Sequence, residues 1–289
     1  MQLKKYTNLD AFYNDTYDVL MRHEAQNIVP LGNLLIGMAC TDKTGWRDTK
    51  NWLMMSVFND SGIMLTAIMT PPMHLTLYAT DNKINTDAID CLIEGLGEYS
   101  MPGVMSEKEL ALCFAESYAK AKCISSEIEM DQKIYELREV NSDIPKIGTL
   151  RRLEEKDMSF FPYWLEGFSG SAKYTDTTMP IPSSDRERYH YRISRGNMYI
   201  LEDNGIPVSM AGLPRKMKTV CALNDVYTPP YFRGRGYASS IVSRISQIAL
   251  DEGFRSVVLY TDLANPTSNN IYQKIGYREI CDSLMIRFV

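Results

Sequence analysis

The stretch at residues 231–242, YFRGRGYASSIV, joins a strand-like segment to a helix-like one and limits the fold more than any other feature. Residues 219–228 before it have β-forming character, and residues 256–261 further on have it again. Between them, small or apolar residues recur with a helical period at Ala238, Ile241, Val242, Ile245, Ile248 and Ala249. Because a strand, a helix and a strand with short connections require a parallel strand pair, we predict an α/β fold.

The turn before this helix has the composition of an anion site. Gly234 and Gly236 allow the backbone to approach a ligand and to take conformations closed to other residues, so several N–H groups can converge on one oxyanion. Arg233 and Arg235 add donors suited to phosphate. Ser239 stands where the dinucleotide fingerprint has its third glycine, and the Gly-Lys-Ser/Thr of a P-loop is absent. We therefore predict a pyrophosphate site; the alternative is a helix start with glycines for packing and arginines for solubility.

Two blocks resemble the GNAT superfamily of N-acetyltransferases. Arg233, Gly236 and Ala238 are similar to the family's acyl-CoA signature, R/Q-x-x-G-x-G/A. The later block TDLANPTSNNIYQKIGY, residues 261–277, looks like the family's next strand-to-helix segment. The resemblance covers roughly the last 140 residues, a normal domain size. It implies a GNAT-like mixed sheet with flanking helices, acetyl-CoA as cosubstrate and no metal.

The resemblance also implies which residues bind acetyl-CoA. The strand before the signature splays from its parallel neighbour in the family, which leaves backbone groups for the pantetheine arm and the thioester. The residues matched to cofactor binding are Val226, Tyr227, Thr228, Arg233, Gly234, Arg235, Gly236, Tyr237, Ala238, Ser239, Asn265 and Asn269. The two asparagines are alternatively a turn residue and a helix cap.

Catalytic candidates are fewer. Tyr272 matches the family's general acid, which protonates the departing thiolate; the alternative is a packed helix aromatic. The strand TVCALNDVYT lacks the family's glutamate base and offers Asp225 instead. Cys221 as a nucleophile is weaker, because an isolated strand cysteine is usually a small core residue. His190 lies on a helix that often borders the acceptor pocket in the family; the alternative is a simply exposed side chain.

The 289 residues suit two domains, which we place at 1–142 and 143–289. In the first half, one long amphipathic helix running from Leu9 toward Pro30 is expected, then a hairpin with a third strand over residues 52–78, and a helix capped at Ser106. This order is compatible with a degenerate copy of the same fold. Residues 101–106, taken as the place of its signature, lack the arginine and the paired glycines, so we expect no acetyl-CoA binding there.

A net charge of −5 argues against nucleic-acid or membrane-surface binding. No signal peptide or apolar run of membrane-spanning length is found, and the six cysteines lack metal-site spacing, so a cytoplasmic protein with reduced thiols is expected. The sequence favours acetyl transfer to a primary amine of a small molecule or peptide, in a monomer or homodimer. The alternative is an acetyl-CoA-binding sensor or scaffold.

Overall fold

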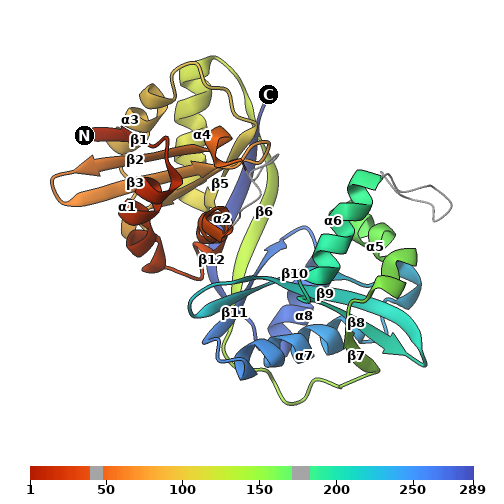
Figure 1. The fold of residues 1–289 in the computed structure, drawn as a ribbon. Helices are drawn as coiled ribbons and strands as arrows, with labels where there is room; N and C mark the ends of the chain where they lie inside the picture. The colour runs from red at the N-terminus through yellow and green to blue at the C-terminus, as the bar shows by residue number, and fades with distance from the viewer. Residues whose placement is uncertain (40–47, 171–182) are drawn as a thin grey trace. The chain divides into compact units, whose positions relative to one another are not determined.

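The computed structural model describes residues 1–39, 48–170 and 183–289 and confirms the α/β fold class (Figure 1). Contacts divide the chain into two compact units. The first unit comprises Met1–Ile134, Tyr260–Asn265 and Glu279–Val289, and the second unit comprises Tyr135–Leu259 and Pro266–Arg278. Each unit therefore contains chain from more than one part of the sequence.

The first unit contains a sheet in the order β1-β2-β3-β4-β5-β12. Neighbours in this sheet pair antiparallel except for β4 and β5, which are parallel. Its strands are β1 Gln2–Lys5, β2 Leu53–Asn59, β3 Gly62–Met69, β4 Leu75–Ala79, β5 Gly103–Glu107 and β12 Arg278–Phe288, and β6 Ser126–Leu137 begins beside them. Its helices are α1 Leu9–Met21, α2 Ile28–Ala39, α3 Thr86–Leu96 and α4 Lys108–Lys122, with short 3₁₀ helices η2 Thr49–Asn51 and η3 Thr80–Asn82.

The start of the chain differs from the single long helix expected. The strand β1 comes first, and two helices follow in place of one. Asn8 caps α1 by accepting from the amides of Asp10 and Ala11. The side chain of Asn27 donates to the carbonyl oxygen of Leu20 at 2.9 Å, which satisfies one of the carbonyls left open where α1 ends.

The core of the first unit lies between its sheet and the helices α3 and α4. Ile89 and Leu92 of α3 and Phe114 of α4 are buried against the sheet together with Leu284 and Ile286 of β12. Fully burying such a side chain stabilises the fold by about 1.5–3 kcal/mol. The last strand of the sequence is therefore a structural part of the first unit.

Two details of the first half were predicted incorrectly. Ser106 does not cap α4: its hydroxyl donates to the carbonyl of Leu77 from within β5, and Glu107 caps the helix by accepting from the amides of Glu109 and Leu110. Residues 101–106 also do not form the turn after a parallel strand, because residues 103–107 are β5 itself. That turn lies instead at residues 80–85, between β4 and α3.

The second unit contains a sheet in the order β11-β10-β9-β8-β7, in which only β10 and β11 pair parallel. Its strands are β7 Thr149–Arg152, β8 Met198–Asp203, β9 Ile206–Lys216, β10 Val220–Tyr227 and β11 Ser256–Asp262, of which the residues from Tyr260 onward are counted with the first unit. Its helices are α5 Phe161–Ser169, α6 Ser183–Ser194, α7 Tyr237–Asp251 and α8 Pro266–Ile275, with the 3₁₀ helices η4 Glu155–Ser159 and η5 Pro230–Phe232. The strand predicted at residues 219–228, the helix after the turn and the strand predicted at residues 256–261 are confirmed as β10, α7 and β11.

Figure 1 shows α7 and α8 on one face of this sheet and α5 and α6 on the other. Each face has its own buried cluster. Ile241 and Ile245 of α7 pack with Leu213 of β9 and with Leu137 at the end of β6. On the opposite face, Phe161 of α5 and Tyr189 of α6 pack with residues of β8 and β9.

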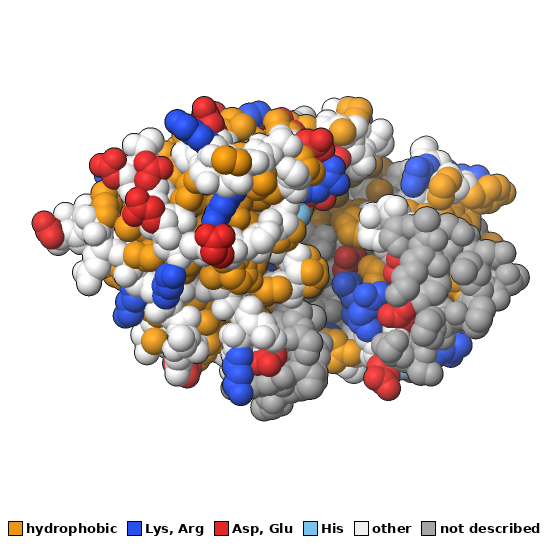
Figure 2. All heavy atoms as spheres, turned by 90° about the horizontal axis from the view of Figure 1, so that it is seen from above, with side chains coloured by type: hydrophobic (Ala, Val, Ile, Leu, Met, Phe, Trp, Pro, Cys, Tyr) orange, Lys and Arg blue, Asp and Glu red, His pale blue; other side chains and the backbone are white. Residues whose placement is uncertain are grey.

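No helix among residues 1–39, 48–170 and 183–289 is long and apolar enough to cross a membrane. Figure 2 shows basic and acidic side chains interspersed on the face that it draws, with apolar side chains between them.

Candidate functional site

The turn between β10 and α7 has the geometry that its glycines suggest. Gly234 and Gly236 both have left-handed backbones, with φ of 77° and 82°. Gly236 is the N-cap of α7, and no side chain of the described residues caps the helix there. The first hydrogen bond of the helix runs from the amide of Ser240 to the carbonyl oxygen of Gly236, at 3.0 Å. The amides of Tyr237, Ala238 and Ser239 precede it, so this end of the helix offers donors to an anion.

Both arginines of the turn are exposed. Arg233 donates from Nε to the carbonyl of Thr228 at 3.0 Å, which ties the start of the turn to the end of the strand. The guanidinium of Arg235 lies 5.4 Å from the ring centroid of Tyr231. Two cations beside the positive end of a helix dipole give this turn a positive potential.

Side chains behind the turn hold it in place. Ser240 Oγ accepts from the amide of Ile147 at 2.9 Å and donates to the carbonyl of the same residue at 3.0 Å. The buried ring of Tyr237 ends in a hydroxyl that donates to Asp203 Oδ2 at 2.5 Å, and this bond raises the pKa of Tyr237. Tyr237 therefore presents only its amide to the turn. Ala238 and Ser239 are half-buried.

The parallel pairing of β10 with β11 stops before β10 itself ends. Its register with β11 runs from Val220 to Ala222, which pairs with Val258, although β10 continues to Tyr227. Val226, Tyr227 and Thr228 are half-buried in the segment beyond this pairing. The carbonyl of Tyr227 accepts from Ser209 Oγ at 3.1 Å, and the same Ser209 oxygen lies 2.9 Å from Thr228 Oγ1.

Asp225 lies in this segment but is neither exposed nor unpaired. Its residue is 3% exposed, its φ is 55°, and Oδ2 accepts from Arg192 Nη1 of α6 at 2.7 Å. Sequence reasoning missed Arg192, because nothing near it in the chain indicates that α6 brings it onto β10.

The α8 candidates lie in different surroundings. The ring of Tyr272 is 8% exposed and packs edge-on against Tyr277 at 5.8 Å, and its burial raises the pKa of its phenol. Asn269 is half-buried on the same helix. Asn265 is exposed and belongs to the segment Tyr260–Asn265 of the first unit.

Two weaker candidates have ordinary structural roles. Cys221 is fully buried, and burial raises the pKa of its thiol to about 12, so the thiolate that a nucleophile needs is scarce at neutral pH. His190 is half exposed on α6 and lies 2.7 Å from Glu155. Five cysteines are free thiols, and Cys40 lies outside the described residues. The described residues contain no cluster of three or more metal-ligating side chains.

The corresponding turn of the first unit, residues 80–85, is built differently. Asn85 caps α3 by accepting from the amide of Ala88 at 2.9 Å, and Asp87 adds a negative charge to the first helical turn. Asp81 and Asn82 have left-handed backbones without being glycine, and the amide groups of Asn82 and Gln26 hydrogen-bond each other in both directions. A helix start that caps itself and carries an acid is unfavourable for phosphate.

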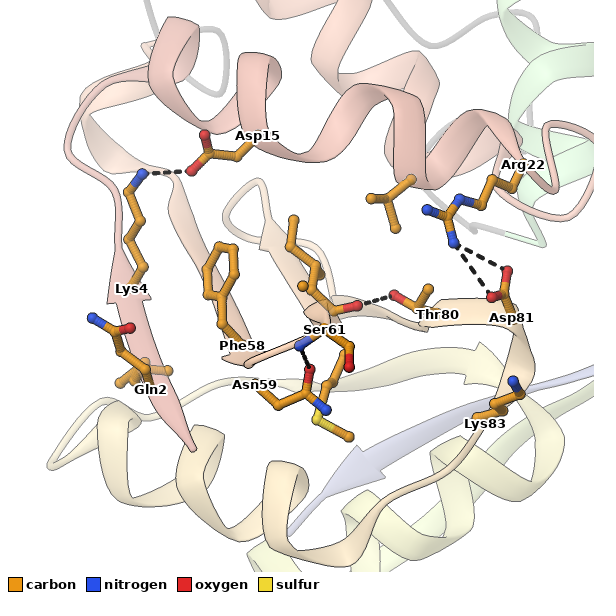
Figure 3. Close-up of a pocket in the computed structure, with 15 residues that line it drawn as sticks. Gln2, Lys4, Asp15, Arg22, Phe58, Asn59, Ser61, Thr80, Asp81 and Lys83 are labelled. Atoms are coloured by element: carbon orange, nitrogen blue, oxygen red, sulfur yellow. Dashed lines mark hydrogen bonds and ion pairs between the residues drawn. The ribbon is translucent and has the colours of Figure 1, made fainter.

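A groove of about 860 Å³ lies beside this turn, also within the first unit (Figure 3). Its floor includes Phe58 and other apolar side chains, while ion pairs between Lys4 and Asp15 and between Arg22 and Asp81 lie at its rim. The groove does not include the amides at the start of α3.

The comparisons with known proteins agree with this geometry. Residues 160–277 match the family described as acetyltransferase (GNAT) family, so this part of the chain is a GNAT domain. Solved structures extend the likeness in fold to the whole chain. A GNAT-family acetyltransferase from Colwellia psychrerythraea has a TM-score of 0.60 at 11% identity and covers 100% of this chain and 99% of its own. A Drosophila protein has a TM-score of 0.63 at 12% identity, with coverage of 99% and 98%. Each half of the chain therefore has a GNAT-like fold.

Curated relatives match shorter stretches. An uncharacterized N-acetyltransferase of Methanocaldococcus jannaschii is 21% identical over 145 residues, which are 46% of this chain and 62% of that protein. The thialysine N-epsilon-acetyltransferase of Sus scrofa is 33% identical over 64 residues, which are 21% of this chain and 36% of that protein. The chain thus spans less than two thirds of either relative, and the relatives support acyl transfer only as a general class of reaction.

Proposed function

We propose that the second half of the chain, residues 143–289, transfers the acetyl group of acetyl-CoA to a primary amine of a small molecule or peptide, by direct attack of the amine in a ternary complex. The observation that carries this proposal is the uncapped start of α7 within a GNAT domain, where two left-handed glycines and two arginines precede the free helical amides. The first half, residues 1–142, is proposed to bind no acetyl-CoA, because its corresponding turn caps itself and carries Asp87.

The residues of the turn fit a pyrophosphate. A Cβ added at Gly234 would meet no atom within 4 Å, so the space outside the turn is open. The backbone from Arg233 to Ser239 would hold the phosphates through its amides, and the arginines would add charge-assisted hydrogen bonds. The backbone of Val226, Tyr227 and Thr228 would bind the pantetheine arm, and Asn269 would donate a further hydrogen bond from the later block.

When bound, acetyl-CoA supplies an activated acetyl group as a thioester. This chain would orient the thioester along β10 and hold a proton at Tyr272 Oη for the departing sulfur. The phenol of Tyr272 is protonated at neutral pH, so a proton is available to the sulfur, but burial raises its pKa and makes it a weaker acid. Asp225 is the candidate base, but its carboxylate is buried and already paired with Arg192 at 2.7 Å. That pairing favours the second candidate function, an acetyl-CoA-binding sensor or scaffold.

Release of the CoA thiol, measured over a panel of aminoglycosides, polyamines and peptides, tests the proposal. Turnover is expected on at least one amine, with Tyr272→Phe lowering kcat about 10²-fold or more and the exposed first-unit control Tyr99→Phe leaving it unchanged. Acetyl-CoA binding without turnover on any amine, and with no effect of Tyr272→Phe, would favour the sensor. No binding of acetyl-CoA at all would refute both functions.

A further inference from the structure

The strand β10 contains one extra residue where it turns away from β11. Between Asn224 and Tyr227 it advances three residues, while the partner positions on β9 move two, from Gly212 to Met210. Asp225 lies inside this interval and has the left-handed φ of 55°. A bulge of this kind bends a strand and re-aims the residues that follow it. The direction of Val226–Thr228 therefore depends on the conformation at Asp225.

That conformation is coupled to a buried charge. The Asp225 side chain is 5% exposed, and its carboxylate faces Arg192 at 2.7 Å. A carboxylate removed from water to this extent requires an opposite charge or several hydrogen-bond donors. Arg192 reaches it from α6, with 37% of its side chain still exposed. The bulge thus has an anchor on a different element of the second unit.

The helix that carries Arg192 is itself fixed over the bulged region. Tyr189, three residues earlier on the same helical face, is fully buried. It belongs to the cluster that contains Met210, the β9 partner of Tyr227, and Tyr227 packs against the same cluster. Arg192 is therefore held above Asp225 by a packed side chain one turn away.

We propose that Arg192 is a positioning residue that acts through Asp225: the ion pair holds the bulge and so fixes the direction of the backbone at Val226–Thr228. Asp225 then has a conformational role, and its carboxylate does not take the proton of the amine. The effect of this ion pair on acetyl transfer rests on the proposed function. The anchoring of the bulge by the ion pair does not depend on the proposed function.

Amide hydrogen exchange of the ligand-free protein tests the anchoring. Asp225→Asn removes the charge while retaining a residue that tolerates a left-handed backbone, and Arg192→Gln removes the partner. Both are expected to speed exchange in the peptide covering residues 224–229 about tenfold, with Arg192→Lys intermediate. The exposed Arg195→Gln, three residues along, is the matched control and leaves the rate unchanged. Unchanged exchange in Arg192→Gln and Asp225→Asn would overturn the proposal.

Titration with CoA, together with steady-state kinetics, separates positioning from base catalysis. Arg192→Gln and Asp225→Asn are each expected to raise the Kd for CoA about tenfold. The double variant is expected to bind CoA as well as either single variant does, because the two substitutions remove the same ion pair. A normal Kd with a lost kcat in Asp225→Asn would identify a base and overturn the proposal. If the wild-type protein binds no CoA, the proposed function fails, and the exchange rates alone decide whether the pair holds the bulge.

Discussion

Replacing Gly236 by alanine tests whether the turn before α7 depends on its left-handed backbone. At φ 82° and ψ 0° an alanine is strained, at a cost of roughly 1–2 kcal/mol. Its Cβ would also lie 3.1 Å from Cδ1 of Ile147, closer than the usual 3.5–4.0 Å between carbons. We expect a total loss in the free energy of unfolding of about 1.5–3 kcal/mol when this contact is added to the strain.

Gly234 provides the comparison. Its φ is 77°, but a Cβ there would meet nothing within 4 Å, so Gly234→Ala should cost only the backbone strain of about 1–2 kcal/mol. Gly234→Asn should recover part of this loss, because asparagine tolerates a left-handed backbone. Urea denaturation measures each loss. Titration with CoA should show weaker binding for both alanine variants, since each disturbs the amides that face the ligand.

The contact with Ile147 can be isolated with a double-mutant cycle. Ile147→Val removes Cδ1, so the loss caused by Gly236→Ala should shrink by about 0.5–1 kcal/mol in that background. The cycle needs no assumption about the enzymatic activity. Equal losses for the two glycine variants with no coupling to Ile147 would refute the steric part of the reasoning, and losses below about 0.5 kcal/mol for both would refute the conformational part.

Three further predictions concern the acid, a buried thiol and the first unit. Tyr272→Phe should lower kcat about 10²-fold or more while leaving the Kd for CoA unchanged; an equal loss in affinity would indicate a packing role. The pKa of Cys221 rises from 9.0 to about 12 on folding, so the folded state retains the proton, and the thiol's contribution to stability is complete below pH 9 and lost as the pH rises toward 12. Denaturation between pH 8 and 10.5 should show that stability falls increasingly steeply above pH 9, with a slope that approaches about 1.4 kcal/mol per pH unit only between the two pKa values; Cys221→Ala should remove this fall, and an unchanged slope would contradict the assignment. Asn85→Ala should cost about 1 kcal/mol of stability through the lost α3 cap, yet leave CoA titrations unaltered; weaker CoA binding would mean that the first unit takes part.

Local patterns in the sequence predicted the second unit well. The glycines of the turn and the helical period after it lie within about twenty residues, and such short-range signals fix where α7 begins. The hairpin of β2 and β3 was predicted for the same reason. In the first unit, the turn equivalent to residues 233–236 was placed at residues 101–106 instead of residues 80–85, because that turn has no glycine: Asp81 and Asn82 supply its left-handed backbone.

Interactions between distant residues were not predictable in this way. The ion pair between Asp225 and Arg192 joins residues 33 positions apart, and α6 has no pattern that marks one arginine as the partner of a buried carboxylate. The role of β12 is a stronger example. Two short strands were expected at the end of the chain, whereas β12 is one strand, and the sheet that it joins depends on long-range packing of Leu284 and Ile286 against α3 and α4.

The pairing of β12 with β5 also has a consequence for synthesis on the ribosome. Residues 103–107 leave the ribosome long before their partners at residues 283–287, and all of the second unit is made in between. At about 5–20 residues per second this takes roughly ten to thirty seconds. During that time β5 has an open edge, which is the kind of surface that invites pairing with another chain. The nascent protein therefore passes through a stage in which its first unit lacks a strand and is most exposed to aggregation or to chaperone binding.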